Sequence, residues 1–131
     1  MNISFSFITF IKSPAKKVYI SNLFTQPGHT DNFSVSDFLR VLQKYIGADT
    51  FTHVVYNTAS MPQSVIRAYT SEIIESPVRI SKDLKKDKRF IGRSLVSRKI
   101  KPRDTSDPIA KIRNPFLHDS AKLARVIMEI A

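Results

Sequence analysis

Side chains able to bind a small polar ligand gather in one stretch, from Asn22 to Asp31. This stretch follows an apolar run, Val18 to Ile20, and precedes an amphipathic one that begins at Ser34. Backbone amides around Gly28 could approach a phosphate closely because glycine has no side chain, and a following helix would add its positive end. The alternative is a Pro-Gly turn whose polar groups only face water. The candidate ligand-binding residues are Asn22, Thr25, Gln26, Gly28 and Thr30.

Asn57 is a second polar position of this kind, because it ends the apolar run His53–Tyr56. If the two apolar runs form neighbouring strands, Asn57 lies beside the first loop, where its amide could read a sugar hydroxyl or a base edge. An Asn at a strand end also commonly bonds its own backbone, and the residues alone leave both interpretations open. Tyr69 lies on a later apolar stripe, which by itself favours core packing.

Strand-like and helix-like segments alternate along the chain, which predicts an α/β fold with a mostly parallel sheet between helices. In such sheets, ligands bind at the carboxyl ends of the strands, where both polar positions would lie. The predicted strands are Lys17–Ser21, His53–Tyr56, Val78–Ile80 and Phe90–Ser97. The predicted helices are Ser34–Ile46, a segment that begins at Ser60 and stops at Pro77, and a last one that begins near Asp119.

Capping residues and apolar stripes support two of these helices. Ser34 with Asp37 resembles a capping box, and Gly47 stands where a left-handed cap is wanted. Asp119 is a good N-cap for the last helix. We expect two buried faces at helical spacing: Val35, Phe38, Leu39, Leu42, Tyr45 and Ile46 in the first, and Leu123, Ala124, Ile127 and Ile130 in the last.

The first residues are harder to assign. Residues 3–11 alternate imperfectly, which favours a strand although Ile8 and Phe10 break the period, and Pro14 ends the segment. The apolar part is short, lacks a basic start and precedes no small-residue cleavage site, so it does not match a signal peptide. We therefore expect a cytoplasmic protein.

Composition excludes several classes of protein. The 131 residues contain no cysteine, so a disulfide framework and a cysteine zinc site are impossible. The histidines have no metal-ligand spacing, and no apolar run approaches the roughly 20 residues of a membrane span. The formal net charge of +10 is concentrated between Lys82 and Arg113, which hold twelve basic and four acidic residues. This basic block contains one aromatic residue, Phe90, and no nucleic-acid-binding signature, so we do not expect a nucleic-acid partner.

The predicted sheet is small for its type. A parallel sheet needs both faces covered and usually has more strands than the three or four predicted here. We therefore predict that residues 1–131 form a single α/β domain that corresponds to the C-terminal half of a larger one.

The sequence from Ser13 to Ala131 resembles the gluconeogenesis factor family of the 2-phospho-L-lactate transferase-like superfamily. The resemblance rests on KSPAKKVYISNLFTQPG at residues 12–28 and on the helix opening S-V-S-D at residues 34–37. It continues in order through Asn57, the segment from Pro62 to Glu72, Pro77-Val78 and His118-Asp119.

The resemblance implies a partial Rossmann-like three-layer sandwich whose N-terminal half is missing here. It implies a bacterial, cytoplasmic regulatory protein that binds a UDP-activated amino sugar or another nucleotide-linked metabolite and is linked to central carbon metabolism and cell shape. The alternative that it implies is a transferase, which moves a 2-phospholactyl group from a GDP-linked donor to a deazaflavin precursor with magnesium. Only this alternative calls for a cofactor.

The resemblance also assigns residues. Asn22, Thr25, Gln26, Gly28 and Thr30 would line the ligand crevice, Asn57 would stand at the neighbouring strand end, and Tyr69 would contact the nucleotide sugar. Leu117 stands where the family has an arginine, and a leucine cannot pair with a phosphate. A second copy of the chain or the missing half are the expected protein partners. A third hypothesis is a basic interaction protein that uses the block from Lys82 to Arg113.

Overall fold

A computed structural model describes residues 5–26, 28–64, 67, 76–97, 106 and 117–131. Helices and strands alternate through most of this length, as predicted. Their order is α1 (Phe5–Lys12), β1 (Val18–Ile20), α2 (Val35–Ile46), β2 (His53–Asn57), the 3-10 helix η1 (Lys82–Lys86), β3 (Phe90–Arg93) and α4 (Ser120–Ile130). None of the described helices is long and apolar enough to cross a membrane.

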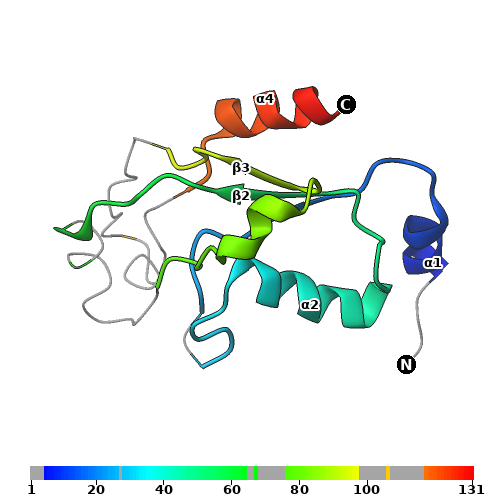
Figure 1. The fold of residues 1–131 in the computed structure, drawn as a ribbon, viewed down its shortest axis with the longest axis horizontal. Coiled ribbons are helices and arrows are strands. Elements are labelled where there is room, and N and C mark those ends of the chain that lie inside the picture. The colour runs from blue at the N-terminus through cyan, green and yellow to red at the C-terminus, as the bar shows by residue number, and fades with distance from the viewer. Residues whose placement is uncertain (1–4, 27, 65–66, 68–75, 98–105, 107–116) are drawn as a thin grey trace.

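The three strands form one parallel sheet in the order β1-β2-β3. Tyr19 is paired with Val54, and Val55 with Ile91. Figure 1 shows the sheet edge-on, with α2 on one face and α4 on the other, while α1 lies beyond the amino ends of the strands. The predicted α/β class, with a partial three-layer sandwich and a parallel sheet, is confirmed.

The core has two halves because strand residues alternate between the faces of a sheet. Val54 and Tyr56 of β2 pack against Val35, Leu39 and Ile46 of α2. On the other face, Val55 and Leu95 pack against Val126 and Ile130 of α4. Both faces of β2 are therefore covered, as a central parallel strand requires.

Helix α2 begins and ends where the sequence predicted. The Ser34 side chain accepts a hydrogen bond from the backbone N–H of Asp37, whose side chain accepts one from the backbone of Ser34. Gly47 closes the helix at φ +91°, a region that favours glycine. Of the predicted face, Val35, Leu39 and Ile46 are buried and Leu42 packs against them, whereas Phe38 is partly covered and outside this cluster and Tyr45 is 54% exposed. Both lie at the side of the stripe and not at its centre.

Helix α4 is also confirmed, with the Asp119 side chain accepting a hydrogen bond from the backbone N–H of Lys122. Its inner face consists of Leu123, Val126 and Ile130. The expected burial of Ala124 and Ile127 is wrong, because both are exposed. These two residues lie about 100° and 40° around the helix from Leu123, on a side with no covering element among the described residues.

Three segments differ from the predictions. The expected strand at residues 3–11 is wrong, because Phe5–Lys12 is helical; apolar residues on both parities do not specify period 2. Val78–Ile80 is not a strand of the sheet and makes only an isolated bridge, between Ser34 and Arg79. The strand predicted at Phe90–Ser97 ends at Arg93. Most of the helix predicted after Ser60 lies outside the described residues.

Close packing between β2 and β3 requires Gly92. A Cβ atom there would lie 2.8 Å from the Tyr56 ring and 2.7 Å from a methyl group of Thr58. Tyr56 and Gly92 are partners in the register, so the tyrosine ring fits beside β3 only because its neighbour has no side chain.

Candidate functional site

A small cleft opens where the carboxyl ends of β1 and β2 meet the first turn of α2. Its volume is about 70 Å³, well below the roughly 300–1,000 Å³ of pockets that enclose whole small-molecule ligands. The cleft can therefore take one ring or chemical group of a larger ligand. It is lined by Ser21, Asn22, Leu23, Val35, Asn57, Ala59, Met61, Pro77, Val78 and Ile80.

The structure brings Asn22 and Asn57 together at this cleft, as the order of elements predicted. Asn57 is committed to the fold, because its amide donates to the carbonyl of Ala59 and accepts from the backbone N–H groups of Ala59 and Leu95. The Asn22 residue is exposed, and its side chain has no hydrogen-bond partner among the described residues. Asn22 is thus the asparagine whose amide is available to a ligand.

The loop after Asn22 is organised by its own hydrogen bonds. The hydroxyl of Thr30 accepts a 2.6 Å bond from the Gln26 N–H, and the Asp31 carboxylate accepts one from the Gly28 N–H. Gly28 has φ +78°. Gln26 and Gly28 are exposed and Thr30 half-buried, and none of them lines the cleft. Their contact with a ligand stays a prediction.

Thr25 is buried, at 3% exposure, and serves the packing of the loop. Its backbone N–H donates to the carbonyl of Ser76, and its hydroxyl contacts both the carbonyl and the N–H of Ser76. Thr25 therefore ties the loop to a distant segment and does not face the cleft. Tyr69, the remaining predicted site residue, lies outside the described residues.

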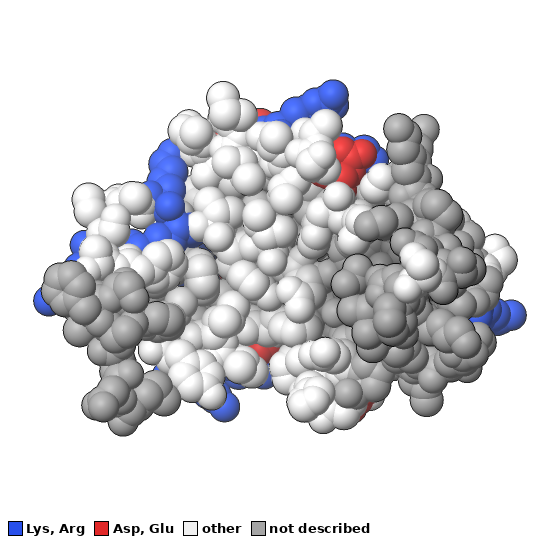
Figure 2. Space-filling view, turned by 180° about the vertical axis from the view of Figure 1, so that it is seen from behind, with Lys and Arg blue, Asp and Glu red and all other residues white. Residues whose placement is uncertain are grey.

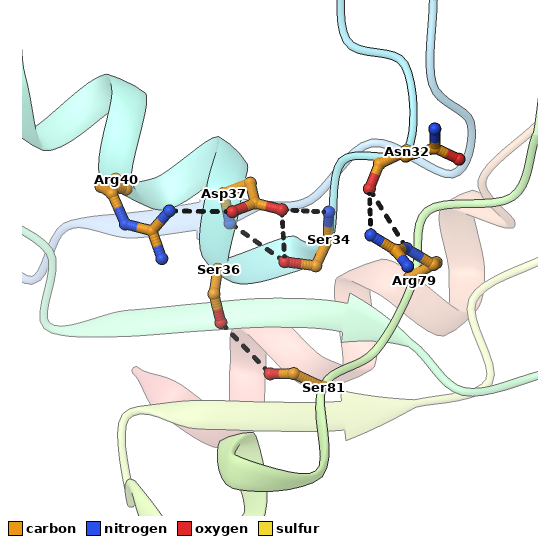
Figure 3. Close-up of polar contacts among 7 residues, drawn as sticks. All are labelled: Asn32, Ser34, Ser36, Asp37, Arg40, Arg79 and Ser81. Atoms are coloured by element: carbon orange, nitrogen blue, oxygen red, sulfur yellow. Dashed lines mark hydrogen bonds and ion pairs between the residues drawn. The ribbon is translucent and has the colours of Figure 1, made fainter.

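The segment from Ser76 to Ile80 closes one side of the cleft, which sequence reasoning missed. The Val78 N–H donates to the carbonyl of Leu23, and the Val35 N–H to the carbonyl of Arg79. The Arg79 guanidinium donates two hydrogen bonds to the backbone carbonyl of Asn32, drawn in Figure 3. No local pattern marks these residues as part of a site, because only the tertiary fold brings them there.

The first turn of α2 carries a carboxylate, that of Asp37. Figure 3 shows the Asp37 carboxylate beside Ser34 and Arg40, and Ser36 beside Ser81. Hydrogen bonds from the backbone and side chain of Ser34 hold the pKa of Asp37 below its usual value, with a smaller contribution from Arg40. An ionised carboxylate thus occupies the positive end of the helix. A phosphate group at this end would meet that negative charge, contrary to the role that the sequence suggested for it.

A histidine from a distant part of the chain lies behind the cleft. His118 forms an isolated bridge with Val96, and a hydrogen bond joins it to the backbone of Ser21, which lines the cleft. Its Nε2 atom is buried and has no hydrogen-bond partner among the described residues. Burial lowers the pKa of His118, and the bond to Ser21 opposes this only in part. A neutral imidazole therefore supports the tip of β1.

The lining of the cleft is uncharged, since it contains no Lys, Arg, Asp or Glu. The Ser21 hydroxyl bonds the Asn22 carbonyl and the Asn57 amide bonds the backbone, so the Asn22 amide is the polar side-chain group that the lining offers to a sugar or a base edge. Within the described ranges, no group of three His, Cys, Asp or Glu residues could hold a metal ion.

Comparison with known proteins gives the sequence a family context. Residues 8–100 match the family model described as 2-phospho-L-lactate transferase CofD. The chain is 28% identical over 121 residues to the gluconeogenesis factor of Bacillus subtilis. It is also 32% identical over 120 residues to a Clostridium acetobutylicum protein and 34% identical over 122 residues to a Thermotoga maritima protein, both of the gluconeogenesis factor group.

These relatives are much longer than the chain. The matches cover 91–92% of this chain but only 24–35% of the relatives. A crystal structure of a UPF0052 family member from Bacillus halodurans has the same fold, with a TM-score of 0.71 and 22% identity. That match covers 93% of this chain and 35% of the other.

Proposed function

The chain belongs to the 2-phospho-L-lactate transferase CofD family, and from this premise we propose that it binds a nucleotide-linked metabolite at the cleft between β1 and β2. We propose a regulatory role of the gluconeogenesis-factor type, in the cytoplasm, linked to central carbon metabolism and cell shape. The relatives' name, gluconeogenesis factor, supports the link to carbon metabolism, whereas the proposed ligand class, a UDP-activated amino sugar, rests on the family resemblance alone.

The observation that carries the proposal is the position of the free Asn22 amide. It stands at the carboxyl end of a parallel strand, in a cleft that the fold keeps open, and this is the edge where α/β sheets bind ligands. Asn22 offers two donors and one acceptor oxygen. Such a group matches the mixed donors and acceptors of an amino sugar or a base.

The chemistry of the lining indicates which part of the ligand enters. An uncharged cleft of about 70 Å³ suits a neutral ring, while burying a diphosphate there without a cation would be costly. The carboxylate of Asp37 at the start of α2 adds to this cost. We therefore propose that the sugar or the base enters the cleft and that the phosphates stay outside it.

Calorimetric titration of the 131-residue chain with a UDP-activated amino sugar tests the proposal. We expect saturable binding that Asn22→Ala weakens at least about tenfold, which corresponds to the loss of roughly 1.4 kcal/mol. Titration with UDP alone and with GDP separates the contribution of the sugar from that of the base. Equal affinity of the wild type and Asn22→Ala would contradict the assignment of the cleft.

Gln43→Ala is the matched control, because it removes a side-chain amide from α2 near the end opposite to the cleft. It should leave the affinity unchanged. Gln26→Ala tests the loop separately: an unchanged affinity would limit the site to the cleft, and a loss would bring the predicted loop residue into it. Thermal unfolding of each variant without ligand reports whether the fold is intact.

The family model favours a second candidate, a transferase that acts on a GDP-linked donor. This candidate predicts that GDP binds more tightly than UDP and that magnesium increases the affinity. Preference for UDP without magnesium would exclude this candidate.

A further inference from the structure

His118 lies at the junction between α4, the chain after β3 and the cleft. Its backbone forms an antiparallel bridge with Val96. The N–H of the next residue, Asp119, donates to the carbonyl of Leu95, whose own N–H donates to the Asn57 side chain at the cleft. The backbone of His118 is therefore held by the same hydrogen bonds that order one wall of the cleft.

The side chain of His118 reaches the end of β1. Burial lowers the pKa of the ring, and a hydrogen bond to the backbone of Ser21 opposes this effect. A hydrogen bond that favours the protonated ring is one that the ring donates, so the Ser21 carbonyl is the acceptor. Because Nε2 has no partner among the described residues, the donor is Nδ1.

The Ser21 carbonyl belongs to the peptide group that leads into Asn22. A peptide group is planar, so a fixed carbonyl also fixes the direction in which the chain enters Asn22. The other side of Ser21 is held by β2, because its N–H donates a 2.8 Å hydrogen bond to the carbonyl of Val55. His118 and β2 together therefore set the position of Asn22 at the cleft.

The buried Nε2 atom makes this arrangement sensitive to protonation. In the neutral ring Nε2 is a nitrogen without a hydrogen, whereas in the protonated ring both nitrogens are donors. Protonation thus creates a charged N–H group with no acceptor among the described residues, and burying such a group is unfavourable. A ring that moves towards water to relieve this cost withdraws Nδ1 from the Ser21 carbonyl.

Three titratable residues lie on the elements that pack around His118. On α4, the Asp119 carboxylate accepts from the N–H of Lys122, and the Lys122 ammonium group donates to the carbonyl of Val96. On β1, burial raises the pKa of Tyr19, which stays neutral. Neither charge on α4 contributes to the lowered pKa of His118, which burial causes. Protonation is therefore opposed mainly by the loss of water around the ring.

Figure 2 shows the side of the molecule on which β1 lies. Uncharged atoms fill its centre, and charged side chains lie towards the margins. The 131-residue chain has a formal net charge of +10, so one more positive charge behind the end of β1 adds to an overall positive potential. Proton uptake by His118 thus gains little from its surroundings.

We propose that His118 is a positioning residue of the ligand site, which holds the peptide group before Asn22 only while its imidazole is neutral. Ligand binding at the cleft and proton binding at His118 are then linked, and each weakens the other. This inference rests on the proposed function, because it concerns the affinity of the same cleft.

The sign of the linkage follows from the form of the ring that supports Asn22. The neutral ring predominates above the ordinary histidine pKa of about 6.5, so the affinity should be highest there. It should fall as the pH drops through the lower pKa of His118 in the folded chain. By reciprocity, a bound ligand should lower this pKa further.

Calorimetric titration with a UDP-activated amino sugar at several pH values tests the linkage. This ligand has no phosphomonoester group, whose second ionisation at about pH 6 would add its own pH dependence. We expect the affinity of the wild type to fall at least about threefold between about pH 7.5 and pH 5. His118→Asn keeps a donor for the Ser21 carbonyl and does not titrate, so its affinity should be close to the wild-type value at the higher pH and should not fall.

His53→Asn is the matched control, because it removes a histidine at the amino end of β2, opposite to the cleft. Its pH profile should match that of the wild type. His118→Ala removes the donor and should weaken binding at least about threefold even at the higher pH. Thermal unfolding at each pH reports whether the chain is folded. Saturable binding with equal pH profiles for the wild type and His118→Asn would overturn this inference and leave the proposed function intact.

NMR of the chain without ligand separates this inference from the proposed function. The backbone amide of Asn22 should shift with pH at the midpoint of the His118 imidazole, and His118→Asn should abolish this shift. If Asn22 follows His118 but no ligand binds at any pH, the proposed function is wrong and the positioning role stands. An Asn22 resonance that does not respond to the titration of His118 would overturn the positioning role, whether or not a ligand binds.

Discussion

At the scale of single residues, two asparagines at neighbouring strand ends have different roles. Both precede polar turns in the sequence, and both line the cleft. The Asn57 amide bonds the backbone of Ala59, in the loop after β2, and of Leu95, after β3. The residues next to Asn57 in the sequence do not predict the bond to Leu95. The Asn22 amide has no partner among the described residues, and the loop after it is held by hydrogen bonds to the side chains of Thr30 and Asp31.

Gly92 is the residue whose replacement should disturb the sheet most directly. Gly92→Ala places a methyl group 2.8 Å from the Tyr56 ring, and overpacking of this kind costs about 1–3 kcal/mol. Chemical denaturation measures the loss. Tyr56→Leu removes the ring, so the Gly92→Ala penalty should shrink in that background. An equal penalty in both backgrounds would show that the ring is not the obstacle.

His118 should make the stability depend on pH. Its pKa is lowered in the folded state, so the unfolded chain takes up the proton more readily. The stability that this neutral side chain contributes is present above its ordinary pKa of about 6.5 and is lost as the pH falls below that value. Denaturation midpoints between pH 7.5 and 5.5 should fall more steeply in the wild type than in His118→Asn. If the midpoints of the wild type and of His118→Asn fell equally with pH, His118 would not be the cause of the pH dependence.

At the scale of elements, α2 is positioned by its N-terminal turn as well as by its apolar face. Ser34→Ala removes the acceptor for the Asp37 N–H and should cost about 1 kcal/mol of folding free energy. Ser36→Ala is the control, because its 3.4 Å contact with Ser81 is weak and lies outside the cap. Thermal unfolding compares the two variants. A smaller loss for Ser34→Ala than for Ser36→Ala would contradict the capping role.

The sequence predicted best the elements that carry their own local signals. β1, α2 and α4 each combine an apolar pattern with a cap or a breaker, and the structure places them within a residue or two of the prediction. The segment at residues 5–12 lacked a clear period, and its assignment to a strand was wrong. Val78–Ile80 has strand-like residues, yet its backbone bonds the loop between β1 and α2 and the start of α2, and not the sheet. Tertiary contacts decide this, and the local sequence does not show them.

At the scale of the whole molecule, three strands and two covering helices match a fold that occupies 35% of the longer Bacillus halodurans chain. The parallel order and the edge at which the cleft lies were predictable, because topology fixes both once the elements are known. Two contacts were not predictable from the sequence, because they join residues about 50 and 100 positions apart. One is the lining of the cleft by residues 76–80, and the other is the contact of His118 with the end of β1. The small size of the sheet was predicted from the number of strand-like segments, and the described residues form three strands.

One measurement tests the central claim, that the end of β1 is the ligand site, more directly than any other. Backbone amide resonances of the isotope-labelled chain are followed by NMR while a UDP-activated amino sugar is added. The account predicts saturable shifts centred on Ser21, Asn22 and Ala59, with α1 and η1 unaffected. Saturable shifts confined to other parts of the chain, with Asn22 unmoved, would contradict it.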